Sequence, residues 1–191
     1  MAYTSLRDFM EALEQRGLLK RVKTPVSPHL EMTEIHRRVL AAGGQALLFE
    51  QVVQENGSAS MPVLVNLFGT VERIAMAMGT TPEALREVGE MLAFLRQPEP
   101  PGGLREAMEL IPLLKKAMAM KPKTVKSAPC QDVVLEGDAI DLAKLPVQTC
   151  WPGDAAPLIT WPLVVTQGPK PAGAQRDPED QYNLGIYRMQ V

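Results

Sequence analysis

The sequence predicts an α+β protein, in which a larger N-terminal domain of helices and strands is followed by the start of a β domain. Two observations predict this. Helical and strand-like hydrophobic periods alternate over the first part of the chain, and near Lys126 the sequence becomes proline-rich with β-branched apolar runs. At 191 residues and 46% hydrophobic content, the chain is large enough to bury a core. We expect two domains, residues 1–125 and 126–191.

The first half of the N-terminal domain is expected to alternate between helices and strands. Residues 5–17 place apolar side chains on one helical face, with Ser5 as the expected N-cap and Gly17 as the terminating residue. Short apolar runs and the glycine pair Gly43-Gly44 mark the bounds of the next elements. These expected elements are a strand at 18–22, a helix at 31–40, strands at 46–49 and 61–68, and a polar loop at 54–60 between these strands.

The second half of this domain is expected to be helical. Thr80-Thr81-Pro82-Glu83 would open a helix with a capping Thr and Pro82 in its first turn. The expected helices are 70–78, 80–95 and 104–120, with a Pro/Gly break at 98–103. Beyond Lys126 the expected strands are 133–135, 158–165 and 184–191. About 65 residues with so few strands and no covering helix form the beginning of a β domain.

Composition excludes some function classes. The chain has 20 Lys plus Arg against 22 Asp plus Glu, a formal charge of -2 and a pI near 5.8, so no overall field recruits nucleic acid. No basic, apolar leader and no long apolar stretch is present, which favours a cytoplasmic protein. Cys130 and Cys150 are expected to be reduced, partly buried thiols. A lysine run leaves open a solvated face or contact with anionic lipid; it comprises Lys115, Lys116, Lys121, Lys123 and Lys126.

Common catalytic motifs do not emerge from the spacing. His29 and His36 lie seven helical residues apart, about 10 Å along the axis, which is too far for both to bind one ion. Glu31 and Glu34 lie between them, but without H-E-x-x-H spacing, so a solvated helix face is the preferred interpretation. The glycine pairs lack the surroundings of a Rossmann fingerprint or a P-loop.

The densest region runs from residue 149 to the end of the chain. Thr160 and Trp161 lie among apolar residues, where a strand could present them to a ligand. In the stretch 182–191, alternation places Asn183, Gly185, Tyr187 and Met189 on one face and Leu184, Ile186, Arg188 and Gln190 on the other. An Arg beside an apolar face suits an anionic, aromatic ligand, and a purely structural role is an equally good interpretation.

Several of these segments together resemble one family. The matching segments, in chain order, are Ser5-Leu6-Arg7-Asp8-Phe9, Ala46-Leu47-Leu48-Phe49-Glu50, Asn66-Leu67-Phe68-Gly69-Thr70, Ala128-Pro129-Cys130, Thr149-Cys150-Trp151-Pro152 and Asn183-Leu184-Gly185-Ile186-Tyr187-Arg188. They resemble the UbiD decarboxylases, and among these the bacterial 3-polyprenyl-4-hydroxybenzoate decarboxylases of ubiquinone biosynthesis. The resemblance covers the N-terminal part of such enzymes. It implies a fragment that ends inside the family's FMN-binding split β-barrel.

The resemblance also implies a cofactor set and site residues. Members bind prenylated FMN, Mn²⁺ and K⁺. By match to the N-x-x-x-x-R strand, Asn183 is implied as a metal ligand, and its amide oxygen is a hard donor that suits manganese. Arg188 is implied as the catalytic arginine, able to hold a carboxylate bidentately. Thr160, Ile186, Tyr187 and Arg188 are implied as cofactor contacts.

The implied reaction is non-oxidative decarboxylation of 3-polyprenyl-4-hydroxybenzoate to 2-polyprenylphenol. The implied partners are this polyprenylated acid, a flavin prenyltransferase that supplies the cofactor, and further copies of the chain in a homo-oligomer, with contact to the inner membrane as a further option. Because the family's other metal ligands and acidic residues have no counterpart, this chain alone is expected to be inactive. The alternatives are a non-catalytic interaction module and a split-barrel flavin oxidoreductase.

Overall fold

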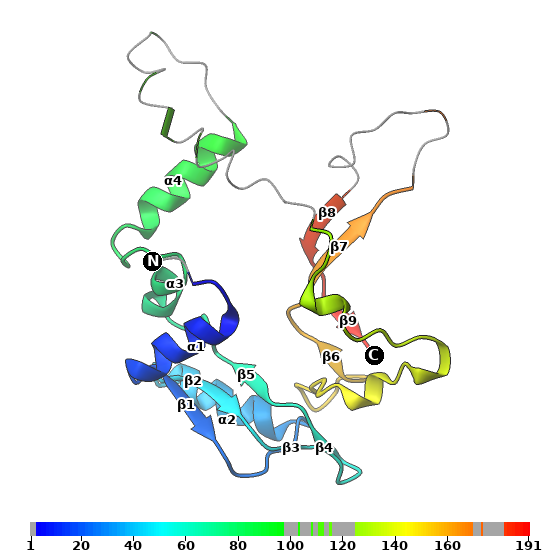
Figure 1. Ribbon diagram of the computed structural model, residues 1–191. Coiled ribbons are helices and arrows are strands. Elements are labelled where there is room, and N and C mark those ends of the chain that lie inside the picture. Colours follow the sequence, from blue (N-terminus) through cyan, green and yellow to red (C-terminus); the bar gives the residue numbers. More distant parts are fainter. Residues whose placement is uncertain are drawn as a thin grey trace. The chain divides into compact units, whose positions relative to one another are not determined.

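The computed structural model describes residues 3–97, 103, 108, 111–112, 115, 125–169, 173 and 182–191 (Figure 1). The chain divides into two compact units, one made of Met1–Thr4 and Val71–Ile140 and the other of Ser5–Thr70 and Asp141–Val191. The predicted break at 98–103 and helix at 104–120 lie largely outside the described residues, as do Lys116, Lys121 and Lys123. The division into domains 1–125 and 126–191 stays a prediction.

A three-stranded sheet organises the second of these units. It consists of β1 (Leu19–Val22), β2 (Ala46–Phe49) and β5 (Val63–Val65), in the order β1-β2-β5. β1 runs parallel to β2, and β5 runs antiparallel to it. All four residues of β2 are buried, as expected for a central strand covered on both faces. The strands predicted at 18–22 and 46–49 are confirmed, and the one predicted at 61–68 is shorter.

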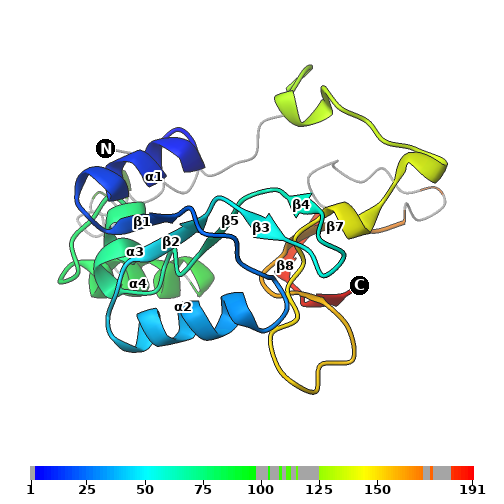
Figure 2. The ribbon, with the colours of Figure 1, turned by 90° about the horizontal axis from the view of Figure 1, so that it is seen from below.

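Two helices cover this sheet. α1 (Leu6–Gln15) begins at the predicted cap, where the Ser5 hydroxyl accepts a hydrogen bond from the Asp8 backbone N–H at 3.2 Å. α2 (Glu31–Ala41) follows β1, and Figure 2 shows α1 and α2 on opposite sides of the sheet. A hydrophobic core cluster forms on the α2 side; its buried members are Val26, Met32, Leu47, Phe49, Val52 and Val65.

A small hairpin replaces part of the loop predicted at 54–60. β3 (Val52–Val53) pairs antiparallel with β4 (Ala59–Ser60) around a turn in which Gly57 has a positive φ of 80°. The polar sequence concealed the hairpin because only Val52 of these strands is buried, so alternation is weak.

In the other unit, the described residues form the helices α3 (Val71–Ala77) and α4 (Leu85–Arg96), and residues 108, 111–112 and 115 are helical as well. The predicted start of the second helix near Thr80 is wrong. The Thr81 hydroxyl accepts a hydrogen bond from the Ala84 N–H at 3.4 Å, which closes a turn before the helix begins. No described helix is long and apolar enough to cross a lipid bilayer.

The β-rich part of the chain differs from prediction in two ways. The predicted strand at 133–135 is absent: these residues are exposed, Val133 by 76%, and no strand among the described residues pairs with them. They are flanked by the 3-10 turns Pro129–Gln131 and Gly137–Ala139, with a third at Leu142–Lys144. Cys130 and Cys150 are free thiols, but Cys130 is exposed rather than partly buried.

Each of the two long predicted strands is interrupted. The stretch 158–165 contains β6 (Leu158–Ile159) and β7 (Leu163–Gln167), and the stretch 184–191 contains parts of β8 (Tyr182–Ile186) and β9 (Met189–Gln190). β6 pairs with β9 and β7 with β8, both antiparallel. The two interruptions face each other in this interrupted hairpin.

Candidate functional site

The interrupted hairpin is joined to the start of α2 by backbone hydrogen bonds. Thr149 donates its N–H to the Pro28 carbonyl at 3.2 Å and accepts the Leu30 N–H at 2.8 Å. The neighbouring Gln148 accepts the Leu158 N–H at 2.8 Å. Through residues 148–149, these bonds connect β6 to the segment that precedes α2, so the same two residues hold the hairpin and the start of the helix.

A β-bulge lies at the centre of the hairpin. Ile159 pairs with Met189 and Leu163 pairs with Ile186, so residues 160–162 oppose only residues 187–188. One extra residue on one strand bends it and redirects nearby side chains, and such bulges are frequent beside active sites. Of the residues implied by the family resemblance, Thr160, Tyr187 and Arg188 lie at this bulge.

Asn183 and Tyr187 are brought together on one side of β8. The Asn183 Nδ2 donates a hydrogen bond to the Tyr187 hydroxyl at 3.4 Å. Gly185 lies between them, and the Tyr187 ring covers it so closely that a Cβ at this position would be 2.6 Å from Cζ. With its nitrogen donating to Tyr187, the Asn183 amide presents its oxygen as a hydrogen-bond acceptor or cation ligand.

Ile186 lies on the face of the hairpin opposite to that of Asn183 and Tyr187. It pairs with Leu163, and Leu184 pairs with Val165. All four side chains are exposed, Leu163 by 74% and Leu184 by 73%. This exposed apolar face therefore separates Ile186 from the Asn183–Tyr187 side, as the sequence alternation predicts.

The charge of the hairpin is concentrated in one residue. Within residues 158–167 and 182–190, Arg188 is the only charged side chain. A lone guanidinium among apolar and neutral polar groups suits an anionic group, such as a carboxylate or a flavin phosphate. Within the part of the chain that the structure describes, no cluster of three or more His, Cys, Asp or Glu could hold a metal ion.

A cavity of about 820 Å³ opens beside Thr160. Its walls come from α2, from the 64–69 segment that contains the end of β5, and from residues 145–151 and 158–161. The lining is mainly apolar, with Thr33, His36 and Asn66 among its polar members. Its volume is in the range typical of small-molecule sites.

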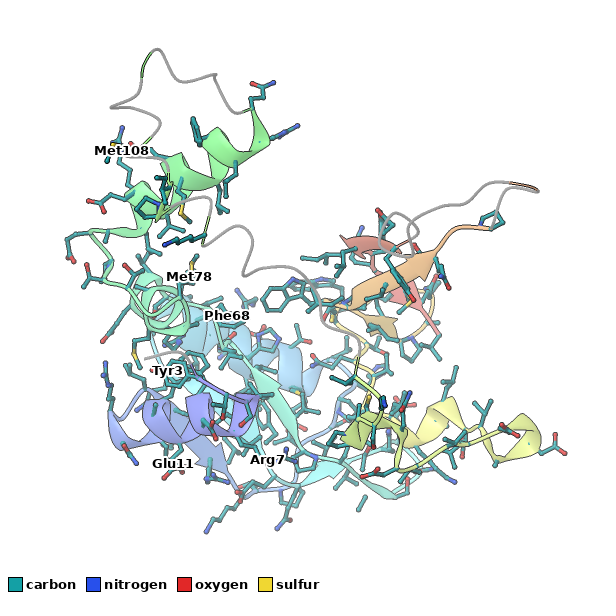
Figure 3. All side chains as sticks on the ribbon, turned by 45° about the horizontal axis from the view of Figure 1, so that its top comes forward. Tyr3, Arg7, Glu11, Phe68, Met78 and Met108 are labelled. Carbon is teal, nitrogen blue, oxygen red and sulfur yellow. The ribbon has the colours of Figure 1, made fainter. Side chains whose placement is uncertain are left out.

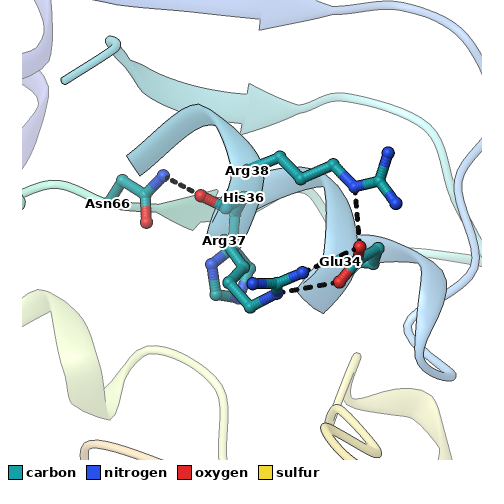
Figure 4. Close-up of polar contacts among 5 residues, drawn as sticks. All are labelled: Glu34, His36, Arg37, Arg38 and Asn66. Carbon is teal, nitrogen blue, oxygen red and sulfur yellow. Dashed lines mark hydrogen bonds and ion pairs between the residues drawn. The ribbon is translucent and has the colours of Figure 1, made fainter. Parts of the chain in front are cut away.

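His36 is half-buried at this cavity, which corrects the interpretation of its helix face as solvated. Its Nδ1 is buried and has no hydrogen-bond partner among the described residues. Burial lowers the pKa of the His36 imidazole, so the ring is neutral at neutral pH. The Asn66 Nδ2 donates to the His36 carbonyl at 2.8 Å (Figure 4), which ties α2 to the residue after β5.

The remaining groups of the His/Glu pattern are engaged elsewhere. Glu34 accepts hydrogen bonds from Arg37 and Arg38 (Figure 4), and these lower the pKa of its carboxyl to about 2. His29 is exposed and lies 3.0 Å from a Glu55 carboxylate oxygen. His29 lies before α2, which begins at Glu31, so the two histidines are not joined by the continuous helix that the spacing argument assumed. That they do not share one ion stays a prediction.

Aromatic contacts connect the hairpin to α1. Phe68, labelled in Figure 3, stacks on Phe9 with ring centroids 6.1 Å apart. Trp161 makes an edge-to-face contact with Phe68, with ring centroids 5.6 Å apart. Such contacts stabilise a geometry as well as burying area, so Phe68 positions the residue that follows Thr160.

Sequence reasoning missed the cavity and its residues His36, Asn66 and Phe68. One signal was available: Thr33, His36 and Leu40 follow helical spacing, so they share a face, and all three line the cavity. Nothing in the sequence indicates the contact between Phe68 and Trp161, because the two residues are far apart along the chain and meet only through the fold.

Comparison with known proteins gives a consistent result. Residues 10–92 match the family model of the 3-octaprenyl-4-hydroxybenzoate carboxy-lyase N-terminal domain, and residues 123–191 match that of the Rift-related domain of the same carboxy-lyase. Among solved structures, an evolved dimeric form of the UbiD-class enzyme HmfF from Pelotomaculum thermopropionicum, in complex with prFMN, is 30% identical with a TM-score of 0.67. The match covers 99% of this chain and 36% of that one.

Two further structures are similar. The open form of the vanillic acid decarboxylase of Sedimentibacter hydroxybenzoicus is 25% identical, with a TM-score of 0.68 and coverage of 100% of this chain and 35% of that one. The apo 3,4-dihydroxybenzoic acid decarboxylase of Enterobacter cloacae is 25% identical, with a TM-score of 0.65 and the same two coverages. The chain thus spans about a third of the length of the solved structures it matches.

Proposed function

The chain belongs to the UbiD family of prFMN-dependent carboxy-lyases, and on that premise we propose that it serves the decarboxylation of 3-polyprenyl-4-hydroxybenzoate to 2-polyprenylphenol in ubiquinone biosynthesis. The α+β fold of the chain is that of the N-terminal portion of UbiD-class enzymes. The observation that carries the proposal is the bulge, where residues 160–162 lie opposite Tyr187 and Arg188, and Arg188 is the only charged residue within 158–167 and 182–190.

Arg188 is the proposed anchor of the substrate carboxylate. A guanidinium can bind both carboxylate oxygens in its plane, which fixes the orientation of the carbon–carbon bond that breaks. Prenylated FMN, when bound, would supply the electron sink for the carbon–carbon bond that breaks as the carboxylate leaves as CO2. Thr160, Ile186 and Tyr187 are proposed to contact that cofactor. Residues 158–167 and 182–190 contain no Asp or Glu, so the proton that replaces CO2 comes from a group outside these strands.

Asn183 is proposed as one ligand of Mn²⁺ beside the cofactor phosphate. The support is the orientation of its amide: the nitrogen donates to Tyr187, which leaves the oxygen to the cation. K⁺ is a further proposed ion, with no residue of this chain assigned to it. The proposed partners are a flavin prenyltransferase, further copies of the chain and the surface of the inner membrane.

Decarboxylation by the polypeptide of the complete reading frame that contains these residues tests the proposal. That protein is loaded with prFMN, Mn²⁺ and K⁺ and incubated with 3-geranyl-4-hydroxybenzoate, and the geranylphenol is quantified by mass spectrometry. We expect turnover that falls on the order of 100-fold in Arg188→Lys, because an ammonium cannot reproduce the bidentate geometry. Arg86→Lys, at an exposed arginine of α4, is the matched control. Product formation that is the same in both variants, or none despite bound prFMN, would contradict the proposal.

A second candidate function is a non-catalytic interaction module. The exposed apolar face formed by Leu163, Val165, Leu184 and Ile186 is the observation that favours it, because an uncovered apolar face of this kind promotes association. Sedimentation of the 191-residue chain without flavin tests it. Association that Leu184→Lys abolishes would favour the module, and a monomer at all concentrations would exclude self-association through this face.

A further inference from the structure

The cavity beside Thr160 is lined without any acidic or basic side chain other than one histidine. None of its lining residues is Asp, Glu, Lys or Arg. His36, its one imidazole, is neutral at neutral pH because burial lowers the pKa of the ring. A cavity without formal charge does not favour a phosphate or a carboxylate, whereas an uncharged apolar group can enter it without the cost of desolvating a charged side chain.

The position of the cavity relative to the bulge is the second observation. Thr160 and Trp161 belong to both, since they line the cavity and form the longer side of the bulge. Arg188 lies on the opposite strand of the bulge and is not among the lining residues. An uncharged, mainly apolar cavity therefore lies beside the bulge whose opposite strand carries Arg188.

From this juxtaposition we infer that the cavity binds the polyprenyl chain of the substrate while the carboxylate of the same molecule is held at Arg188. The inference rests on the proposed function and names the subsite for one part of its substrate. In a 3-polyprenyl-4-hydroxybenzoate the chain and the carboxylate leave the ring at different carbons, so one molecule can place the chain in the cavity and the acid at the bulge.

Two indoles provide surface for an apolar chain. Trp151 and Trp161 both line the cavity, and both remain more than half exposed. Covering them with an isoprenoid removes apolar area from water at both surfaces. The contact of Trp161 with Phe68 holds one indole in place before the ligand arrives, which limits the entropy lost on binding.

Intrinsic fluorescence reports directly on this cavity, because the chain has two Trp and both line it. The 191-residue chain is titrated with 3-geranyl-4-hydroxybenzoate and with 4-hydroxybenzoate, without flavin. We expect a saturable change in tryptophan fluorescence with the geranyl compound. Its affinity should be at least about tenfold higher than that of 4-hydroxybenzoate, because the geranyl group is buried in the cavity. Equal affinities would overturn the inference.

A cavity-filling variant distinguishes binding in this cavity from nonspecific hydrophobic binding elsewhere on the protein. Val147 lines the cavity, so Val147→Phe is expected to weaken binding of the geranyl compound about tenfold or more. Val134 is exposed and does not line the cavity, so Val134→Phe is the matched control and should bind as the wild type. Wild-type affinity in Val147→Phe, with circular dichroism unchanged, would overturn the inference.

A direct contact measurement covers the case in which Val147→Phe does not fold. Nuclear Overhauser effects between the geranyl methyl protons and the Trp161 indole protons of the wild-type chain are expected, and their absence at saturating ligand would overturn the inference. Since no flavin is present in these experiments, their failure leaves the decarboxylation proposal untouched. Conversely, binding of the geranyl compound in the cavity without turnover by the loaded enzyme would contradict the proposed function alone.

Discussion

The ring of Tyr187 lies directly over Gly185, and its hydroxyl accepts a hydrogen bond from Asn183. The contact is possible because residue 185 has no side chain: a Cβ would be 2.6 Å from the ring Cζ and 2.8 Å from the hydroxyl oxygen. The glycine therefore allows Tyr187 to orient the amide that is proposed to face the metal.

We predict that Gly185→Ala displaces the Tyr187 ring and breaks its hydrogen bond with Asn183. The side-chain amide signals of Asn183 in a ¹H–¹⁵N spectrum should shift in Gly185→Ala and in Tyr187→Phe alike. Gly168→Ala is the control, because a Cβ at Gly168 meets nothing within 4 Å. Unchanged Asn183 signals in Gly185→Ala would show that the ring does not control the amide.

Phe68 and Trp161 are expected to be energetically coupled. Their edge-to-face contact contributes about 0.5–1.5 kcal/mol beyond area burial in comparable pairs. A double-mutant cycle of Phe68→Ala and Trp161→Ala, measured by urea unfolding, should give a coupling free energy of this size. Additive losses, with no coupling beyond experimental error, would mean that the contact does not stabilise the protein.

The pH dependence of stability should carry a signature of His36. Burial lowers the pKa of His36 in the folded state below the ordinary value of 6.5, so the unfolded chain binds the proton more tightly. The stabilising contribution is complete above pH 6.5 and is lost as the pH falls from there through the lowered folded-state pKa. Between about pH 7 and pH 5 the free energy of unfolding should therefore fall more steeply in the wild type than in His36→Gln.

His29→Gln is the control for that experiment, because it removes a histidine but leaves His36 in place. It should retain the steeper wild-type slope in urea unfolding over the same pH range. If His36→Gln has the same slope as the wild type, the imidazole is not titrating in a buried environment.

The cap of α1 gives a prediction about the N-terminal helix. Ser5→Ala removes the hydroxyl that accepts the Asp8 N–H and should lower the free energy of unfolding by about 1 kcal/mol. Ser5→Asn keeps an acceptor at the cap and should stay close to the wild type in the same urea titration. A loss of equal size in both variants would indicate that the serine has a role other than capping.

Local signals predicted much of the first sheet and its helices. Ser5 is a cap, Gly17 follows α1 with a positive φ, and the run at 46–49 is a strand buried on both faces. These features depend on neighbouring residues, which a sequence displays directly. The same is true of the alternation that separates Asn183 from Ile186 along β8.

Features that depend on distant residues were not predictable in this way. The bulge arises from the register of two strands, so neither 160–162 nor 187–188 reveals it alone. Val133 has strand propensity but pairs with no described strand, because propensity needs a neighbour to become structure. His36 looked solvated because its helix face is polar, and only the fold shows the segments that bury it.

The central position of β2 has a consequence for how the molecule opens. β2 is hydrogen-bonded to β1 on one side and β5 on the other, and all four of its residues are buried. Its amide protons should exchange with solvent only when the whole sheet comes apart. β7 and β8 bond only to each other among the described strands and are largely exposed, so their amides should exchange through local separation. The segment that carries Asn183 is thus free to change shape while the sheet between α1 and α2 keeps its form.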